Sequence, residues 1–279
     1  ADNDRLVIFS NIYEVSPVWG MVGELVTIYA NGFGANEDIE INFGKTPTIA
    51  VANTDYTGAF IGIFTVDVQP AGWTTVTAYG INSYEQASSK YRISAKITVL
   101  SPSHGTVGTI VRVDGNAFAA TDSVKIDFGW TKAIVEAVCN DAGVFSTTFT
   151  IDTQVVGTRT VMANSTKNLE LYAFQIFTVE PHITQVTPTE GTVGTLITVT
   201  GDGYAATETV RIDFGLTTSR TSVVSDHRGW FEKTFTIDIQ PYGITNVVAT
   251  GMDSYATETD SLLIKGNITN ILPAFGTVG

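Results

Sequence analysis

Three aspartates recur at matching places along this chain, and their side chains could bind a metal ion. Asp67, Asp152 and Asp238 each follow a run in which apolar and polar residues alternate. Ca²⁺ takes clustered carboxylate and carbonyl oxygens, so these aspartates are candidate calcium ligands. The D-x-D-x-D spacing of a dedicated calcium loop is missing, and turn capping explains the same residues. We therefore expect that no cofactor is required, with structural calcium as the alternative.

The other reactive side chains form no catalytic pattern. The three histidines have no cysteine, histidine or carboxylate at metal-ligand spacing, and no serine lies in a nucleophile motif. Residues 105–108 (GTVG) lack the lysine of a phosphate-binding loop. An active site needs several such groups together, so the sequence predicts a protein that is not an enzyme.

Two asparagines are candidate glycosylation sites, because each begins an Asn-x-Ser/Thr sequon. These are Asn164 and Asn267. Chance occurrence in a chain rich in Asn, Ser and Thr is the alternative. The chain begins Ala-Asp-Asn-Asp, which would suit the mature end left by a signal peptidase, and an extracellular location at the cell surface or envelope is the expectation.

The aspartates recur because the whole chain repeats. Pro17, Pro102, Pro188 and Pro273 stand 85, 86 and 85 residues apart. Such a period indicates duplication of one structural unit. We predict domain 1 at residues 1–95, domain 2 at 96–181, domain 3 at 182–266, and the start of a fourth repeat at 267–279. A longer array is the expectation.

Each repeat is predicted to be all-β. Apolar residues alternate with polar ones in about seven short runs, separated by Gly, Asn, Asp and Pro clusters, and no helical period lasts ten residues. This pattern predicts an immunoglobulin-like β-sandwich, with a small closed barrel as the alternative. The predicted core of domain 1 comprises Val26, Ile28, Ile39, Ile41, Phe43, Phe60, Phe64 and Val66. Short linkers predict that three such domains form an extended rod.

Composition excludes several classes of partner. The formal net charge is −13 with no Lys/Arg cluster, which argues against nucleic acid and anionic membrane surfaces. No apolar run is long enough to span a bilayer. The single cysteine, Cys139, excludes an internal disulfide framework and is expected to be a small buried residue.

The third repeat resembles the IPT/TIG family of immunoglobulin-like domains. Residues 183–204 (ITQVTPTEGTVGTLITVTGDGY) are similar to the family's opening, which has a proline, two glycines, a strand and then Gly-x-Gly-Phe/Tyr. Residues 210–215 (VRIDFG) resemble its next strand. Domains 1 and 2 depart from the pattern at Ala30 and Ala117. The resemblance implies the fold; the function varies among such modules.

One group of residues breaks the repeat. Tyr29, Ile61 and Ile63 occupy outward positions that are polar in the other two repeats. The two strands that carry them are neighbours in one sheet of an immunoglobulin-like sandwich, so an apolar patch is predicted. Contiguous apolar surface marks interaction sites. We predict an interface here, with the alternative that residues 5–10 (RLVIFS) fold over the patch.

Tandem acidic modules without a catalytic pattern favour a structural role. The leading hypothesis is a surface-layer (S-layer) lattice subunit of a microbial cell surface, which self-associates or binds neighbouring envelope proteins. The alternatives are an adhesin stalk, or glycan- or protein-binding modules attached to an enzyme outside this segment. Binding modules would present exposed aromatic residues in line, whereas lattice subunits would have apolar patches that differ between domains.

Overall fold

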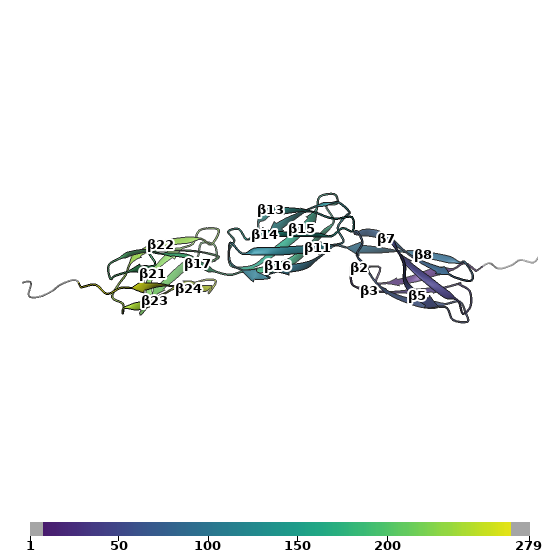
Figure 1. Ribbon diagram of the computed structural model, residues 1–279, viewed down its shortest axis with the longest axis horizontal. Helices are drawn as coiled ribbons and strands as arrows, with labels where there is room; N and C mark the ends of the chain where they lie inside the picture. The colour runs from purple at the N-terminus through teal and green to yellow at the C-terminus, as the bar shows by residue number, and fades with distance from the viewer. Residues whose placement is uncertain (1–7, 269–279) are drawn as a thin grey trace, which may run out of the picture. The chain divides into compact units, whose positions relative to one another are not determined.

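The computed structural model describes residues 8–268, and these form strands and turns with no helix. Within this range no helical segment has the length and apolar character to cross a membrane. Each of the three repeats contains two sheets, one of three strands and one of five (Figure 1). The predicted arrangement of three tandem immunoglobulin-like β-sandwich domains is confirmed, and the separate sheets exclude the closed barrel.

Domain 1 sets the pattern that the other two follow. Its three-stranded sheet has the order β1-β3-β6 and its five-stranded sheet the order β2-β8-β7-β4-β5. The strands are β1 (Asn11–Ser16), β2 (Trp19–Met21), β3 (Leu25–Asn31), β4 (Asp38–Phe43), β5 (Thr46–Asn53), β6 (Phe60–Thr65), β7 (Gly72–Gly80) and β8 (Gln86–Ser94).

Domains 2 and 3 repeat this order. In domain 2 the strands are β9 (Lys96–Ser101), β10 (His104–Gly105), β11 (Ile110–Asn116), β12 (Ser123–Phe128), β13 (Thr131–Val138), β14 (Phe145–Thr150), β15 (Gly157–Ser165) and β16 (Tyr172–Val179). In domain 3 they are β17 (His182–Thr187), β18 (Glu190–Gly191), β19 (Leu196–Asp202), β20 (Thr209–Phe214), β21 (Thr217–Val224), β22 (Phe231–Thr236), β23 (Gly243–Gly251) and β24 (Thr257–Ile264).

Each domain has one more strand than the sequence predicted. A proline (Pro17 in domain 1) lies just before a strand of two or three residues. Proline has no N–H to give to a sheet ladder, and here it separates β1 from β2. The short β2 then pairs in parallel with β8, in the other sheet. The opening of each domain therefore contributes to both sheets.

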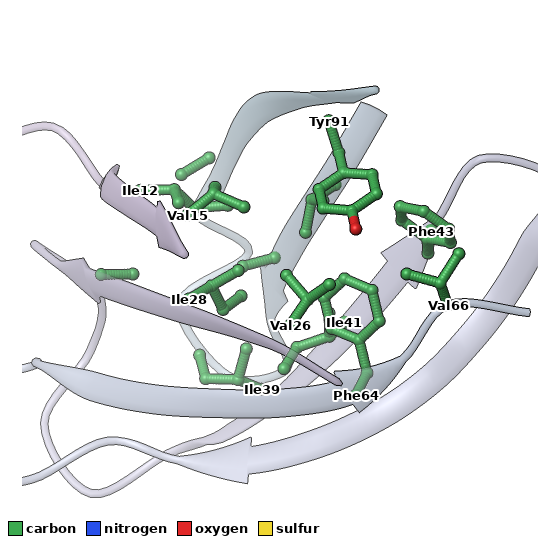
Figure 2. Packing of buried hydrophobic residues seen from close by; sticks show 14 of the residues in the cluster. Ile12, Val15, Val26, Ile28, Ile39, Ile41, Phe43, Phe64, Val66 and Tyr91 are labelled. Atoms are coloured by element: carbon green, nitrogen blue, oxygen red, sulfur yellow. The ribbon is translucent and has the colours of Figure 1, made fainter. Parts of the chain in front are cut away.

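The core lies between the two sheets, where the alternating apolar residues meet. All eight residues predicted for domain 1 are buried, with at most 5% of their surface exposed, and Figure 2 shows many of them in one cluster with Tyr91. Phe43 and Phe64 face each other across the core at 5.0 Å between ring centroids. Their counterparts Phe128 and Phe149 repeat the contact at 5.3 Å.

An asparagine side chain organises the turn that precedes β14. The side chain of Asn140 accepts hydrogen bonds from the backbone N–H groups of Ala142 and Val144, each at 3.0 Å. Gly143 closes this turn with φ of 74°, and a Cβ there would meet the Phe118 carbonyl oxygen at 2.0 Å. The turn therefore requires glycine.

Candidate interaction faces of domain 1

The predicted apolar residues lie together on the outer face of the three-stranded sheet. Tyr29 on β3 is directly opposite Ile61 on β6, and Ile63 is opposite Thr27. Ile61 and Ile63 are 59% and 57% exposed, while Tyr29 is partly buried. Opposed side chains on one face lie about 5 Å apart at Cβ. The three residues therefore form one continuous surface, which we call the apolar face.

Tyr13 extends this face, although the sequence pattern did not include it. Its ring centroid lies 6.3 Å from that of Tyr29, and the residue is 56% exposed. The sequence signal was weak because β1 has a register irregularity between Ile12 and Glu14, which interrupts the strict alternation. Leu25, at the start of β3, is 66% exposed; leucine or isoleucine stands at the equivalent positions of domains 2 and 3.

The other two domains build polar pairs at the same positions. In domain 2, Ser146 donates a hydrogen bond to Asp114 at 2.6 Å, where domain 1 has Ile61 and Tyr29. In domain 3, Thr200 is opposite Glu232. An exposed antiparallel sheet face is ordinarily polar. The substitution of apolar residues is therefore specific to domain 1 and is not demanded by the fold.

The described part of the N-terminal stretch does not cover the apolar face. Ile8 and Phe9 are 69% and 78% exposed, and the hydroxyl of Ser10 donates to the backbone oxygen of Gln86 at 2.9 Å, on the other sheet. Residues 5–7 lie outside the described range. An interface at Tyr29, Ile61 and Ile63 stays a prediction.

A second group of exposed residues lies on the outer face of the five-stranded sheet of domain 1. Trp19 on β2, Arg92 on β8 and Trp73 on β7 occupy one row across three adjacent strands. Sequence reasoning missed this row because the residues are far apart along the chain. One indication of this row was present in the sequence: both tryptophans occur in the first repeat, and neither occurs at the matching positions of the other two repeats.

The predicted calcium candidates hold turns within their own domains. In domain 1 the carboxylate of Asp67 accepts hydrogen bonds from Thr46 and, at 2.6 Å, from Gln69. In domain 3 Asp238 accepts from Thr217 at 2.7 Å and from Gln240 at 2.9 Å. Burial raises the pKa of Asp238, but these hydrogen bonds and the charge of Arg220 outweigh it, so the pKa lies below its ordinary value.

Asp152 in domain 2 makes the equivalent contact, accepting a hydrogen bond from Gln154 at 2.9 Å. Across residues 8–268, no three His, Cys, Asp or Glu side chains gather as a metal site would require. The role of these aspartates in calcium binding is an untested proposal.

A comparison with protein families matches residues 181–263 to the IPT/TIG domain. Domain 3 is an IPT/TIG domain. Domains 1 and 2 share its strand order in both sheets and its sequence period. The family resemblance expected from residues 183–204 is therefore confirmed where the motif is most complete.

Comparison with solved structures finds similar chains at low identity. One determined with xylogluco-oligosaccharide has 14% identity and a TM-score of 0.33, with 91% of this chain and 60% of that chain covered. Invasin, a bacterial integrin-binding protein, has 12% identity and a TM-score of 0.30, with coverages of 93% and 60%. Bacteroides ovatus SGBP-B in complex with a mixed-linkage heptasaccharide has 11% identity and a TM-score of 0.26, with coverages of 91% and 67%.

These values concern the fold and carry no argument about function. The chain spans only 60% of the length of the first two structures. The comparison with curated protein sequences finds no match.

The two predicted glycosylation sites differ in accessibility. Asn164, on β15 of the second repeat, is partly buried, and its side-chain amide donates to Asp127 at 3.0 Å. Asn267 follows the last strand of the IPT/TIG domain and is exposed. Modification of either residue stays a prediction.

Cys139 is buried as expected, and burial together with the charge of Asp122 raises the pKa of its thiol to about 11.

Proposed function

We propose that this chain is a structural, non-catalytic segment of an exported cell-surface protein, and that the parent protein is a surface-layer lattice subunit. The observation that carries the proposal is the apolar face of domain 1. The three domains have matching core residues and the same sheet order, yet only the first replaces the polar pairs of that face by Tyr29, Ile61 and Ile63.

A lattice explains why copies of one fold differ on their surfaces. In a repeated assembly each domain of a subunit meets a different neighbour, so each outer face is selected separately while the cores stay alike. A partner that covers Ile61 and Ile63 removes apolar surface from water, which favours association by about 25 cal/mol per Å² buried. The occupant that we propose is a second copy of the parent protein.

An acidic surface is compatible with this role. The formal net charge of −13 keeps such a protein soluble before assembly. It also makes two copies repel each other, so the free energy gained from an apolar contact must be larger than this repulsion. Association should therefore strengthen as salt screens the repulsion. A contact made by ion pairs between copies would weaken under the same change.

Self-association of the purified chain tests the proposal. We expect sedimentation velocity to show concentration-dependent association, and Ile61→Glu with Ile63→Lys to abolish it. The matched control is Thr234→Lys in domain 3, which already has Glu232 and thus gives the same pair of charges at the equivalent outer positions. Circular dichroism verifies that both variants fold. Unchanged association of the double variant would reject the apolar face as the contact.

Isolated cell envelopes distinguish the lattice from the alternatives. Electron microscopy should show a periodic coat that antibodies against this chain label. An adhesin stalk would instead give isolated projections. Glycan- or protein-binding modules attached to an enzyme would be found with that enzyme and without a periodic coat.

A further inference from the structure

The row of Trp19, Arg92 and Trp73 lies on the face opposite to the apolar face of domain 1. Arg92 is paired with Trp19 across the parallel β2–β8 ladder and with Trp73 across the antiparallel β7–β8 ladder. Trp19 and Trp73 are 57% and 68% exposed. Figure 1 labels the three strands that carry the row. Arg92 therefore lies between two exposed tryptophans.

The fold does not require these side chains. The same ladder positions are filled by His104, Thr178 and Thr158 in domain 2, and by Glu190, Leu263 and Ile244 in domain 3. All three domains form the same sheet with these different residues. Exposing two indoles is costly in water, so the row in domain 1 calls for an explanation other than folding.

The three side chains form one row across three neighbouring strands. Neighbouring strands lie about 4.8 Å apart, so the two tryptophans stand about 10 Å from each other along one line. At this separation, two rings of one extended ligand can each stack on one of the two indoles. Lys90, two residues before Arg92 on the same face of β8, donates to Thr75 at 3.0 Å and adds a second positive charge.

Arg92 has no carboxylate partner of its own. Within residues 8–268 its side chain forms no ion pair or hydrogen bond, whereas Arg112 and Arg211 each pair with a neighbouring aspartate. A guanidinium offers planar, paired donors that match a carboxylate. In a chain with 28 acidic residues, this unpaired cation between two aromatic rings indicates an anionic ligand that also has apolar faces.

We propose that Trp19, Arg92 and Trp73 form a binding site for an acidic oligosaccharide. The C–H face of a pyranose ring stacks on an indole, and a uronate carboxylate on an intervening or adjacent sugar pairs with Arg92. An acidic peptide fits less well, because peptides that bind sheets add to a strand edge, and this row crosses the face of the sheet. The site is independent of lattice formation, since it lies on the other sheet.

Calorimetric titration of the whole chain tests this proposal with three probes of uronic acid: oligogalacturonate, alginate oligosaccharide and hyaluronan oligosaccharide. We expect at least one to bind. Trp19→Ala and Trp73→Ala should each weaken that binding by about tenfold or more, the loss typical of a central aromatic contact. Arg92→Gln should remove the preference for the acidic probe over cellohexaose, a neutral oligosaccharide, while leaving stacking in place.

Two controls separate this site from other effects. Tyr56→Ala removes an aromatic side chain that is 82% exposed but lies outside the row, and it should leave binding unchanged. Ile61→Glu with Ile63→Lys should also bind normally, which distinguishes this site from the contact proposed for self-association. The proposal is overturned if none of the three probes binds, if both tryptophan variants bind as wild type does, or if only a poly-glutamate peptide binds.

Discussion

The side-chain amide of Gln69 donates a hydrogen bond of 2.6 Å to the carboxylate of Asp67, and this pair recurs in every domain. The same amide donates to the backbone oxygen of Phe43 at 2.9 Å, and its oxygen accepts from the N–H of Lys45 at 2.9 Å. The pair therefore links the end of one strand to the turn between β4 and β5. This contact gives the repeated aspartate a structural role.

Asp238→Ala tests that role in domain 3. The substitution leaves one amide hydrogen of Gln240 and the hydroxyl of Thr217 without their acceptor. We expect the free energy of unfolding to fall by about 1–2 kcal/mol. The fall should be equal in EDTA and in millimolar Ca²⁺, and calcium should not change the melting temperature of the wild type. A calcium-dependent stabilisation that the variant loses would instead assign Asp238 to a metal site.

Glu37 is a buried carboxylate that sequence reasoning did not single out. It is 2% exposed and accepts hydrogen bonds from the backbone N–H groups of Ser83 at 2.8 Å and Asn82 at 3.0 Å. Glu208 repeats the arrangement in domain 3, accepting from the N–H of Ser254 at 3.0 Å. Burial raises the pKa of Glu37, but hydrogen bonds from Ser83, Gly34 and Asn82 outweigh it and lower the pKa.

Glu37→Gln should therefore destabilise domain 1 in a pH-dependent way. An amide cannot accept on both sides as the carboxylate does, so we expect a loss of about 1–3 kcal/mol at pH 7. A lowered pKa in the folded state means that ionised Glu37 stabilises the protein above the unfolded pKa of about 4.3. This stabilisation disappears as pH falls through the folded pKa. Denaturant unfolding should thus show a large difference between variant and wild type at pH 7 and a small one at pH 2.5.

Tyr91 offers a change that should stabilise the protein. Its hydroxyl is buried in the core of domain 1 (Figure 2) and has no hydrogen-bond partner among the described residues. Burial, with the charge of Glu24, raises its pKa to about 12. Domain 2 has Phe177 at this position. Tyr91→Phe removes an unsatisfied polar group without leaving a cavity, so the free energy of unfolding should rise by about 1 kcal/mol. A fall would show that the hydroxyl has a partner such as a bound water.

Local alternation was sufficient to predict the core, but not the surfaces. Val26 and Ile28 lie two apart on one strand, and a period of two fixes which face each residue takes. The division of the first strand at Pro17 was missed, because pairing of β2 with β8 is a contact between distant segments. Trp19 and Trp73 likewise come into one row only in the folded sheet. Their strands, β2 and β7, both pair with β8, which carries Arg92.

The candidate interface was predictable to the extent that it rested on repeat comparison. Tyr29, Ile61 and Ile63 stood out because the other two repeats supply polar residues at the same positions. Tyr13 did not stand out, because the register of β1 is irregular and alternation therefore does not show which face its side chain takes. Glu37 was missed for a different reason: its partners are backbone N–H groups of a loop. The sequence signal was an acidic residue that recurs on the repeat period, as Asp122 and Glu208.

Grafting the apolar face onto domain 2 tests whether these side chains are sufficient for association. Asp114→Tyr, Ser146→Ile and Thr148→Ile place the three residues at equivalent outward positions of β11 and β14, which are adjacent strands. The graft removes the hydrogen bond between Ser146 and Asp114 at 2.6 Å and the exposed ion pair between Arg112 and Asp114 at 2.7 Å. The hydrogen bond costs about 1 kcal/mol and an exposed ion pair about 0–1 kcal/mol, so domain 2 should still fold. Sedimentation equilibrium should then show stronger self-association than the wild type.

The control for the graft is Asp114→Asn, which removes the same negative charge without adding apolar surface. If that variant associates as strongly as the graft, charge repulsion and not the apolar face governs assembly. Combining the graft with Ile61→Glu and Ile63→Lys gives the decisive comparison. Because domain 2 then carries the sole copy of the face, restored association would show that these residues form the contact themselves, whichever domain presents them.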